Sequence, residues 1–185
     1  MNSLNFIFIL FVCITLYCPP QSFTLAQSVQ LSDQTLSPFS VALDNLQIQI
    51  NYTFENIGLL RRAMTHASYS EENNKALSVL GVRLIEASVA LQLLTKNVDA
   101  SSKELNSRIV EIDNIATSCA LDGTHLGLQN IVRVSFKTSS MAPAVVCGAF
   151  RAIFGAIAVD TGSLDEGGRV FWKVHKGGVG RAMAM

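Results

Sequence analysis

The sequence predicts an all-α fold, because apolar residues recur with the period of a helix in several separate segments. Residues 38–50 place four of them on one helical face: Phe39, Leu43, Leu46 and Ile50. Residues 143–159 are apolar on every side, which predicts a helix at the centre of the core. The 185 residues, 49% of them hydrophobic, suffice for one domain with a substantial core and exclude intrinsic disorder.

The first 26 residues have most features of a secretory signal peptide. They contain no charged side chain, and their apolar block at residues 4–17 is shorter than the about 20 residues that span a bilayer. Small residues lead up to Ala26, so we expect cleavage there, although no Lys or Arg precedes the apolar block. An organelle transit peptide and an uncleaved membrane anchor are the alternatives. Residues 27–37, which are polar and rich in Ser and Gln, predict an irregular lead-in.

A cleaved signal peptide would place the mature chain in the secretory pathway, in the lumen of the ER or of the nuclear envelope. A mitochondrion or plastid is the alternative location. In the secretory pathway Asn51-Tyr52-Thr53 is a candidate glycosylation site, and an unmodified chance match is the other interpretation. Cys119 and Cys147 lie in apolar helical segments, which favours two buried free thiols over a disulfide. We expect no transmembrane span in the mature chain.

A second helix is expected at residues 55–65, followed by a polar loop at residues 66–74. A third helix is expected from Asn74 to Lys96, packed against the central helix. The side chains expected on its buried face are Leu77, Val79, Leu80, Leu84, Ile85, Val89 and Leu93. Gly81 costs this helix about 1 kcal/mol relative to alanine, which indicates that another helix approaches closely there.

Ser101 and Glu104 form a capping box, which predicts the start of a fourth helix. Its apolar face continues to Cys119, and Asp122-Gly123 is expected to end it.

The rest of the chain is expected to complete the helical domain. A polar loop at residues 137–141 leads into the central helix. A final helix is expected at residues 164–174. The domain as a whole is expected to span residues 38–178, followed by a tail at residues 179–185.

Three segments together resemble the signature of the ribonuclease III domain. They are Ala-Met-Thr-His-Ala-Ser at residues 63–68, Asn-Lys-Ala-Leu-Ser-Val-Leu-Gly-Val at residues 74–82 and Gly-Ala-Ile-Ala-Val-Asp-Thr-Gly at residues 155–162. The resemblance covers about residues 52–173 and implies a ribonuclease III-like endonuclease-domain helical bundle. The residues that it implies for the structural frame of the motif are Thr65, His66, Gly81, Gly155 and Asp160. His66 is expected to brace the loop by hydrogen bonds and not to bind metal.

The resemblance also implies where members of this family bind divalent metal ions. Those positions hold no carboxylate here, being Lys75, Ser78, Val82, Gly148 and Arg151. Because Mg²⁺ prefers carboxylate oxygens, and Arg151 would place a fixed positive charge beside the ion, we expect no metal site, no cofactor and no catalytic residue. Arg151 is expected either to pair with Glu86 or another helix acid, or to point to solvent.

The expected function is therefore that of a pseudoenzyme that acts by binding. Fourteen basic and fourteen acidic residues cancel, so no strong field attracts nucleic acid. The leader and the motif segments resemble a small plant group with a single degenerate domain, which implies a role in fusion of nuclei (karyogamy) in the female gametophyte.

Two alternatives concern RNA: a double-stranded RNA endoribonuclease with unusual ligands, and an organellar structural pseudonuclease that binds RNA. Family members pair through the helix of the first motif, which implies a homodimer around Val79. The sequence names no other protein partner.

Overall fold

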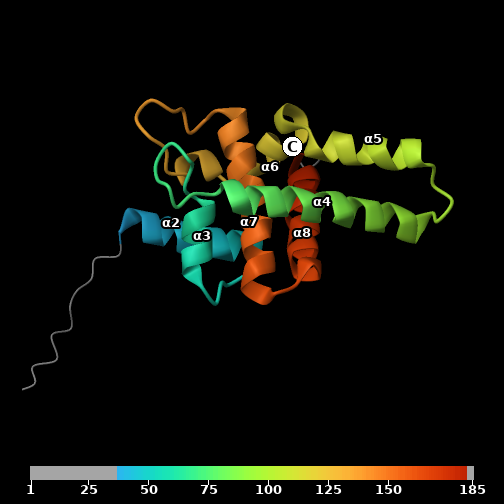
Figure 1. Cartoon of the computed structure of the whole chain (residues 1–185), viewed down its shortest axis with the longest axis horizontal. Coiled ribbons are helices and arrows are strands. Elements are labelled where there is room, and N and C mark those ends of the chain that lie inside the picture. Colours follow the sequence, from blue (N-terminus) through green and yellow to red (C-terminus); the bar gives the residue numbers. More distant parts are fainter. Residues whose placement is uncertain (1–36, 183–185) are drawn as a thin grey trace, which may run out of the picture. The chain divides into compact units, whose positions relative to one another are not determined.

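The computed structural model describes residues 37–182, and this part of the chain is helical, which confirms the predicted fold class (Figure 1). The elements in chain order are α2 (Pro38–Ile50), α3 (Ile57–Ala63), α4 (Lys75–Lys96), α5 (Ser102–Asp113), the π-helix η1 (Ile115–Cys119), α6 (Ala120–His125), the 3₁₀ helix η2 (Leu128–Asn130), α7 (Pro143–Thr161) and α8 (Leu164–Ala182). Among these residues, β structure is limited to an isolated bridge between Thr65 and Arg133. The expected signal peptide at residues 1–26, the lead-in up to residue 36 and residues 183–185 of the tail lie outside the described residues.

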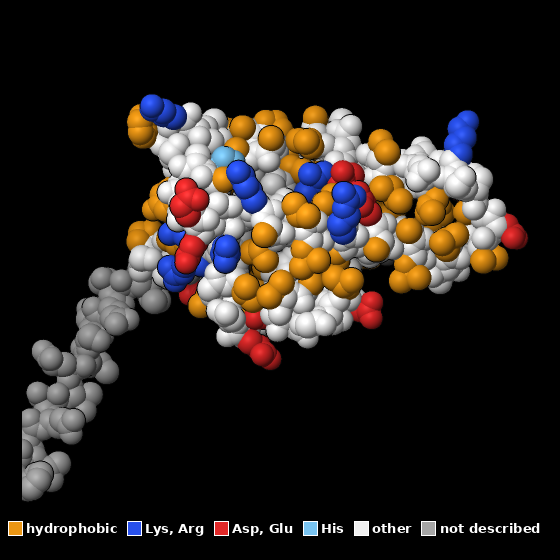
Figure 2. Space-filling view, in the orientation of Figure 1, with side chains coloured by type: hydrophobic (Ala, Val, Ile, Leu, Met, Phe, Trp, Pro, Cys, Tyr) orange, Lys and Arg blue, Asp and Glu red, His pale blue; other side chains and the backbone are white. Residues whose placement is uncertain are grey.

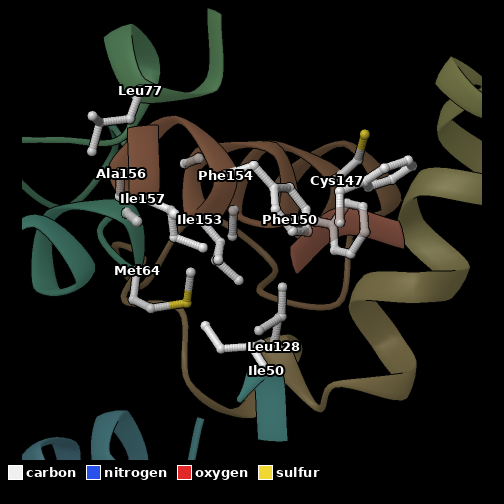
Figure 3. Packing of buried hydrophobic residues seen from close by; sticks show 14 of the residues in the cluster. Ile50, Met64, Leu77, Leu128, Cys147, Phe150, Ile153, Phe154, Ala156 and Ile157 are labelled. Atoms are coloured by element: carbon white, nitrogen blue, oxygen red, sulfur yellow. The ribbon is translucent and has the colours of Figure 1, made fainter. Parts of the chain in front are cut away.

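Helix α7 lies at the centre of the core, as its all-round apolar sequence predicts. Helices α3, α4, α6 and α8 pack around it. Figure 3 shows Ile50, Met64 and Leu128 beside its side chains Ile153 and Ile157. Aromatic rings extend the core towards α8: the ring centroids of Phe150 and Phe154 are 4.9 Å apart, and those of Phe154 and Phe171 are 5.4 Å apart, both edge to face.

Helices α4 and α7 are each long and apolar enough to cross a membrane by length and composition alone. They pack against each other, and α7 is mostly buried by its neighbours. A buried core helix of a soluble protein has the same length and composition, so these two properties do not identify a span.

Two glycines set the crossing of α4 and α7. A Cβ atom at Gly81 would lie 1.8 Å from the carbonyl oxygen of Arg151, and one at Gly155 would lie 2.0 Å from the carbonyl oxygen of Leu77. Any side chain at either position would therefore overlap the backbone of the other helix. The close approach expected at Gly81 is present, and Gly155 is its counterpart on α7.

The N-terminal helices α2 and α3 begin at side-chain caps. The Ser37 hydroxyl accepts a hydrogen bond from the Ser40 N–H at 3.2 Å, so α2 begins where Ser37 and Pro38 predict. Helix α3 is shorter than the expected 55–65, because the Asn56 side chain caps it by accepting from the Gly58 N–H at 3.0 Å. The backbone N–H groups of Glu55 and Asn56 are directed to another acceptor, described below.

The expected helix from Ser101 to Cys119 is divided into two. The Ser101 cap is present, because its hydroxyl accepts from the Glu104 N–H at 3.1 Å. Helix α5 nevertheless ends at Asp113, where the extended backbone of Asn114 (φ −61°, ψ 123°) interrupts it. The Asn114 side chain then accepts from two backbone N–H groups of η1, so one residue ends α5 and caps the next turn.

Asp122-Gly123 does not end a helix, contrary to the prediction, because both residues lie inside α6. Gly123 is there for packing: a Cβ atom at this position would lie 2.6 Å from the Val146 side chain. Asp122 is buried, and its carboxylate lies 2.7 Å from Nδ1 of His175 on α8. The residues expected to break the helix therefore attach α6 to α7 and α8.

Cys119 and Cys147 form a disulfide between η1 and α7, so the prediction of two free thiols is wrong. Their Cα atoms are 5.1 Å apart, and both residues are buried. The sequence prediction was correct about burial. It could not foresee that the π-helical turn would bring the two thiols together.

Val79 and the final helix also differ from what the sequence predicts. Val79 is 64% exposed, so it does not belong to the buried face of α4 on which it was expected. Leu77, Leu84, Ile85 and Val89 do form that face. Helix α8 begins at Leu164 as expected but continues to Ala182, beyond the predicted helix end at residue 174.

Candidate functional site

The crossing of α4 and α7 brings together the two helices on which the family resemblance implies metal ligands. Ser78 and Val82, on either side of Gly81, are partly exposed on α4, and Lys75 is exposed at its start. Gly148 is partly exposed on α7, and a Cβ atom there would meet no other atom within 4 Å. The site therefore lies at an accessible edge of the helix pair.

Arg151 forms an ion pair with Asp113, the last residue of α5. Its Nη2 donates to the Asp113 carboxylate and, at 2.8 Å, to the Asp113 backbone carbonyl. The two side chains are only 17% and 31% exposed, so solvent screens this pair less than an ordinary surface pair. The carbonyl groups at the end of α5 carry a partial negative charge, so one guanidinium neutralises both that helix end and the carboxylate.

Glu86 does not neutralise Arg151. Its carboxylate pairs with Arg83 on the same helix, with an N–O distance of 2.8 Å. Of the three outcomes expected for Arg151, the structure shows pairing with another helix acid, and that acid comes from a different helix.

The side chains at this crossing do not fit a divalent metal ion. They offer a hydroxyl at Ser78, an aliphatic group at Val82, no side chain at Gly148 and a cation at Arg151. Within residues 37–182, no three His, Cys, Asp or Glu side chains are close enough together to hold a metal ion. Mg²⁺ needs hard oxygen ligands, and the Asp113 carboxylate is already bound to Arg151.

Thr65 and His66 hold the loop that leads into α4. The Thr65 hydroxyl donates to the Arg61 carbonyl at 2.7 Å and accepts from Nη2 of Arg133 at 2.6 Å. The His66 N–H donates to the Arg133 carbonyl at 2.9 Å, and its ring Nδ1 accepts from the Ser68 N–H at 3.0 Å. Both residues thereby tie this loop to the segment before α7.

Asp160, near the end of α7, holds the segment between α2 and α3. Its carboxylate accepts from the Tyr52 hydroxyl at 2.7 Å and from the N–H groups of Glu55 and Asn56, each at 2.9 Å. Burial tends to raise the pKa of Asp160, but these bonds from Tyr52 and the backbone lower it below its ordinary value. Burial, and next the bond to Asp160, raise the pKa of the Tyr52 hydroxyl above its usual range.

An apolar stripe runs along the exposed side of α4. We define the α4 stripe as Val79, Ala87, Leu91 and Leu94, which are all exposed and lie at helical spacing. Figure 2 shows hydrophobic side chains along α4 on the visible face, with basic and acidic side chains near the middle. The Arg83–Glu86 ion pair lies between Val79 and Ala87 in the sequence of α4.

A groove of about 690 Å³ lies beside the stripe, between the second half of α4 and the first half of α8. Its lining includes Leu84, Leu91 and Thr95 on α4, and Leu164, Gly168 and Trp172 on α8. The Trp172 indole N–H donates to the Ser88 hydroxyl at 2.8 Å, which fixes the floor of the groove. Because Leu91 belongs to both, the groove adjoins the second half of the α4 stripe.

Two structural residues of this region were missed by sequence reasoning. Asp113 is one of several acids in a polar helix, and no spacing relates it to Arg151. Arg133 lies over the rings of Phe39 and Tyr69, 4.4 and 4.9 Å from their centroids, and no local motif predicts this long-range contact. In both cases the partners are far apart in the sequence.

Comparisons with known proteins agree with this arrangement. The model of the Ribonuclease-III-like family matches residues 56–170. The Protein NUCLEAR FUSION DEFECTIVE 2 of Arabidopsis thaliana is 57% identical over 149 residues, which cover 80% of this chain and 78% of that protein. A Ribonuclease 3 of Thiobacillus denitrificans is 32% identical over 132 residues, which cover 68% of this chain and 56% of that protein.

Among solved structures, the nuclease domain of ribonuclease III from Campylobacter jejuni superposes with a TM-score of 0.69 at 23% identity. The match covers 74% of this chain and 97% of that domain, and at this identity it shows the shared fold. That structure concerns a region involved in dimer formation.

Proposed function

This chain belongs to the ribonuclease-III-like family, and from this premise we propose that it is a non-catalytic member that acts by binding. The observation that supports this most directly is the Arg151–Asp113 ion pair at the crossing of α4 and α7. A metal-dependent nuclease needs a cluster of negative charge there to hold its cation. Here the positively charged Arg151 side chain occupies a position at which the resemblance implies a metal ligand.

Incubation with long duplex RNA and Mg²⁺ tests the absence of catalysis. We expect no cleavage products from the full chain, and no difference between it and Glu86→Ala, because Glu86 pairs with Arg83. A bacterial ribonuclease III serves as the positive control. Cleavage that Glu86→Ala abolishes would contradict the proposal.

Binding of Mn²⁺ gives a second readout that does not depend on activity. We expect no heat of binding for the wild-type chain in calorimetric titration. A variant with carboxylates at four positions, Ser78→Glu, Val82→Asp, Gly148→Asp and Arg151→Glu, should bind Mn²⁺ if its circular dichroism shows an intact fold. Stoichiometric binding by the wild-type chain would refute the proposed loss of the metal site.

We propose further that the chain has a role in fusion of nuclei (karyogamy) in the plant female gametophyte. The support is its similarity to the Arabidopsis protein, whose name refers to nuclear fusion and of which it covers 78%. The test is complementation of plants that lack that relative, with the wild-type chain and with the four-carboxylate variant. Restored fusion of nuclei by the wild-type chain supports the role, and failure of a correctly expressed chain argues against it.

The proposed location is the lumen of the ER or nuclear envelope. The Cys119–Cys147 disulfide supports it, because structural disulfides persist in oxidising compartments. The apolar, uncharged start of the sequence supports it as well. A fluorescent protein fused after residue 185 and protease protection of isolated membranes test this location, and import into mitochondria or plastids would contradict it.

We also propose a homodimer through the α4 stripe. Its exposed apolar side chains are the kind of surface that a subunit interface buries, and the Arg83–Glu86 pair offers opposite charges that two copies related by a two-fold axis could exchange. Leu91→Asp should shift the protein to a monomer in analytical ultracentrifugation. Ile48→Asp, at an exposed position on α2, is the control that should leave the assembly unchanged.

The alternative function is RNA binding without cleavage, for which the similarity to the bacterial Ribonuclease 3 is the supporting observation. It predicts binding of duplex RNA that weakens steeply with salt concentration. Because 14 basic and 14 acidic residues cancel, we expect no such binding at physiological salt.

A further inference from the structure

We propose that Asn51 carries an N-linked glycan in the native protein. Asn51-Tyr52-Thr53 is the one Asn-x-Ser/Thr sequence in the chain in which x is not proline. The inference rests on the proposed location, because this modification is made in the lumen of the secretory pathway. The local geometry supports it independently of that location.

Asn51 stands at the end of α2 in a left-handed conformation, with φ 52° and ψ 48°. Asparagine tolerates this conformation better than most residues, so the helix can end there without glycine. The side chain is exposed. Among the described residues, no hydrogen bond involves the side-chain amide of Asn51, so the fold does not engage the acceptor nitrogen.

The side chains of Asn51, Tyr52 and Thr53 alternate between exposed and inward positions. Tyr52 is directed inward, because its hydroxyl reaches Asp160 and its ring packs edge to face on Phe54 with the centroids 4.8 Å apart. Asn51 and Thr53 on either side of it are exposed. The fold therefore anchors the middle residue and leaves the amide and the Thr53 hydroxyl accessible, which are the two groups that the modification requires.

The modification is a group transfer whose donor is a polyprenyl pyrophosphate-linked oligosaccharide. The bond between the sugar C1 and the pyrophosphate oxygen breaks, and a bond between C1 and Nδ2 of Asn51 forms. The amide nitrogen gives one proton to a base of the transferase, and the polyprenyl pyrophosphate leaves.

A glycan at this position would leave the α4 stripe accessible. In Figure 1, α4 crosses in front of α7, whereas α2 passes behind α3 and α7 and carries Asn51 at its end. Asn51 lies at the end of α2, whereas the proposed dimer surface lies on another helix, α4. Removing the glycan should leave the assembly state of the protein unchanged in ultracentrifugation.

The test is expression of the full chain with its own leader in plant cells, followed by treatment with an N-glycosidase and electrophoresis. We expect the untreated protein to migrate as one glycoform and to shift once to a faster band. Thr53→Ala should abolish this shift without altering the backbone at Asn51, and Thr53→Ser should retain it. Asn51→Gly removes the acceptor while keeping a residue that accepts positive φ, so it tests the site without straining the helix end.

A second form, with an established secretory signal placed before Met1, separates the two proposals. If this form enters the lumen and remains unmodified, the Asn51 proposal is wrong whatever the natural location. If it is modified but the form with its own leader is not, the natural chain does not reach the transferase, which refutes both the location and the native glycan. A glycosidase shift that persists in Thr53→Ala would place the glycan elsewhere and also refute the proposal.

Discussion

At the scale of single residues, the pairing of Arg151 with Asp113 should contribute more stability than the ion pairs on the surface. The two side chains are 17% and 31% exposed, whereas those of Arg108 and Glu111 are 54% and 64% exposed. We expect a coupling energy of about 1–2 kcal/mol for the first pair and roughly 0.2–1 kcal/mol for the second. Double-mutant cycles with alanine, measured by urea denaturation, give both numbers, and equal coupling would contradict this view of the site.

Asp160 should make a pH-dependent contribution to stability. Asp160→Asn removes a charge that accepts three hydrogen bonds, so the free energy of unfolding at pH 7 should fall by about 1–3 kcal/mol. Tyr52→Phe removes one of the three bonds and should cost about 1 kcal/mol.

The sign of the pH dependence follows from the lowered pKa of Asp160 in the folded state. The stabilising effect of the Asp160 carboxylate is complete above about 4, the pKa of this group in the unfolded chain. The effect is lost as the pH falls through the lower pKa of the folded state. The difference between wild type and Asp160→Asn should therefore be constant from pH 7 to pH 5 and decrease towards pH 3. Urea titrations at these three values check it, and a difference that grows at low pH would show that the carboxylate is not the cause.

At the scale of elements, two glycines of α7 should respond oppositely to the same substitution. Gly155→Ala places a Cβ atom 2.0 Å from the Leu77 carbonyl, so we expect a loss of about 3 kcal/mol or more in the free energy of unfolding. Gly148→Ala meets no atom within 4 Å, so the better helix propensity of alanine should stabilise the protein by about 0.5–1 kcal/mol. Thermal denaturation of the two variants decides this, and a destabilising Gly148→Ala would mean that α7 is distorted there.

Several elements could be predicted because their signals are local. Ser37 with Pro38 marks the start of α2, and Ser101 with Glu104 marks the start of α5. The end of α5 could not be predicted, because the apolar positions continue past it. Asn114 breaks the helix by an extended backbone and a side-chain cap, which compete with a hydrophobic pattern that stays helical. The all-round apolar sequence of α7 correctly predicted its central place, because no other environment suits such a helix.

The candidate site could be predicted only in part, and for a similar reason. The side chains present at the crossing are read directly from the sequence. The partner of Arg151 lies on another helix, and the choice among Glu86, Asp113 and solvent depends on packing that periodicity does not contain. The prediction placed Val79 on the buried face of α4, but Val79 is exposed. It lies next to buried positions of the helix, and a rotation of the helix by one residue changes burial into exposure.

At the scale of the whole molecule, the disulfide should contribute much of the stability. It closes a loop between residues 28 positions apart, so its chain-entropy effect is about 3–4 kcal/mol. We expect reductant to lower the midpoint of urea denaturation of the wild-type chain. The double variant Cys119→Ala, Cys147→Ala should unfold at a similarly low midpoint and show no response to reductant. An unchanged wild-type midpoint, with reduction verified by thiol labelling, would show that the bond is dispensable.

The contact at Gly81 and Gly155 bears on which residues beside the helix crossing can vary. In this contact, main-chain atoms of one helix meet main-chain atoms of the other, so the angle between the helices does not depend on which side chains flank it. The residues that flank it, such as Ser78, Val82 and Arg151, can therefore vary without a change in this contact. The helix crossing and the chemistry of the side chains beside it are thus free to change separately.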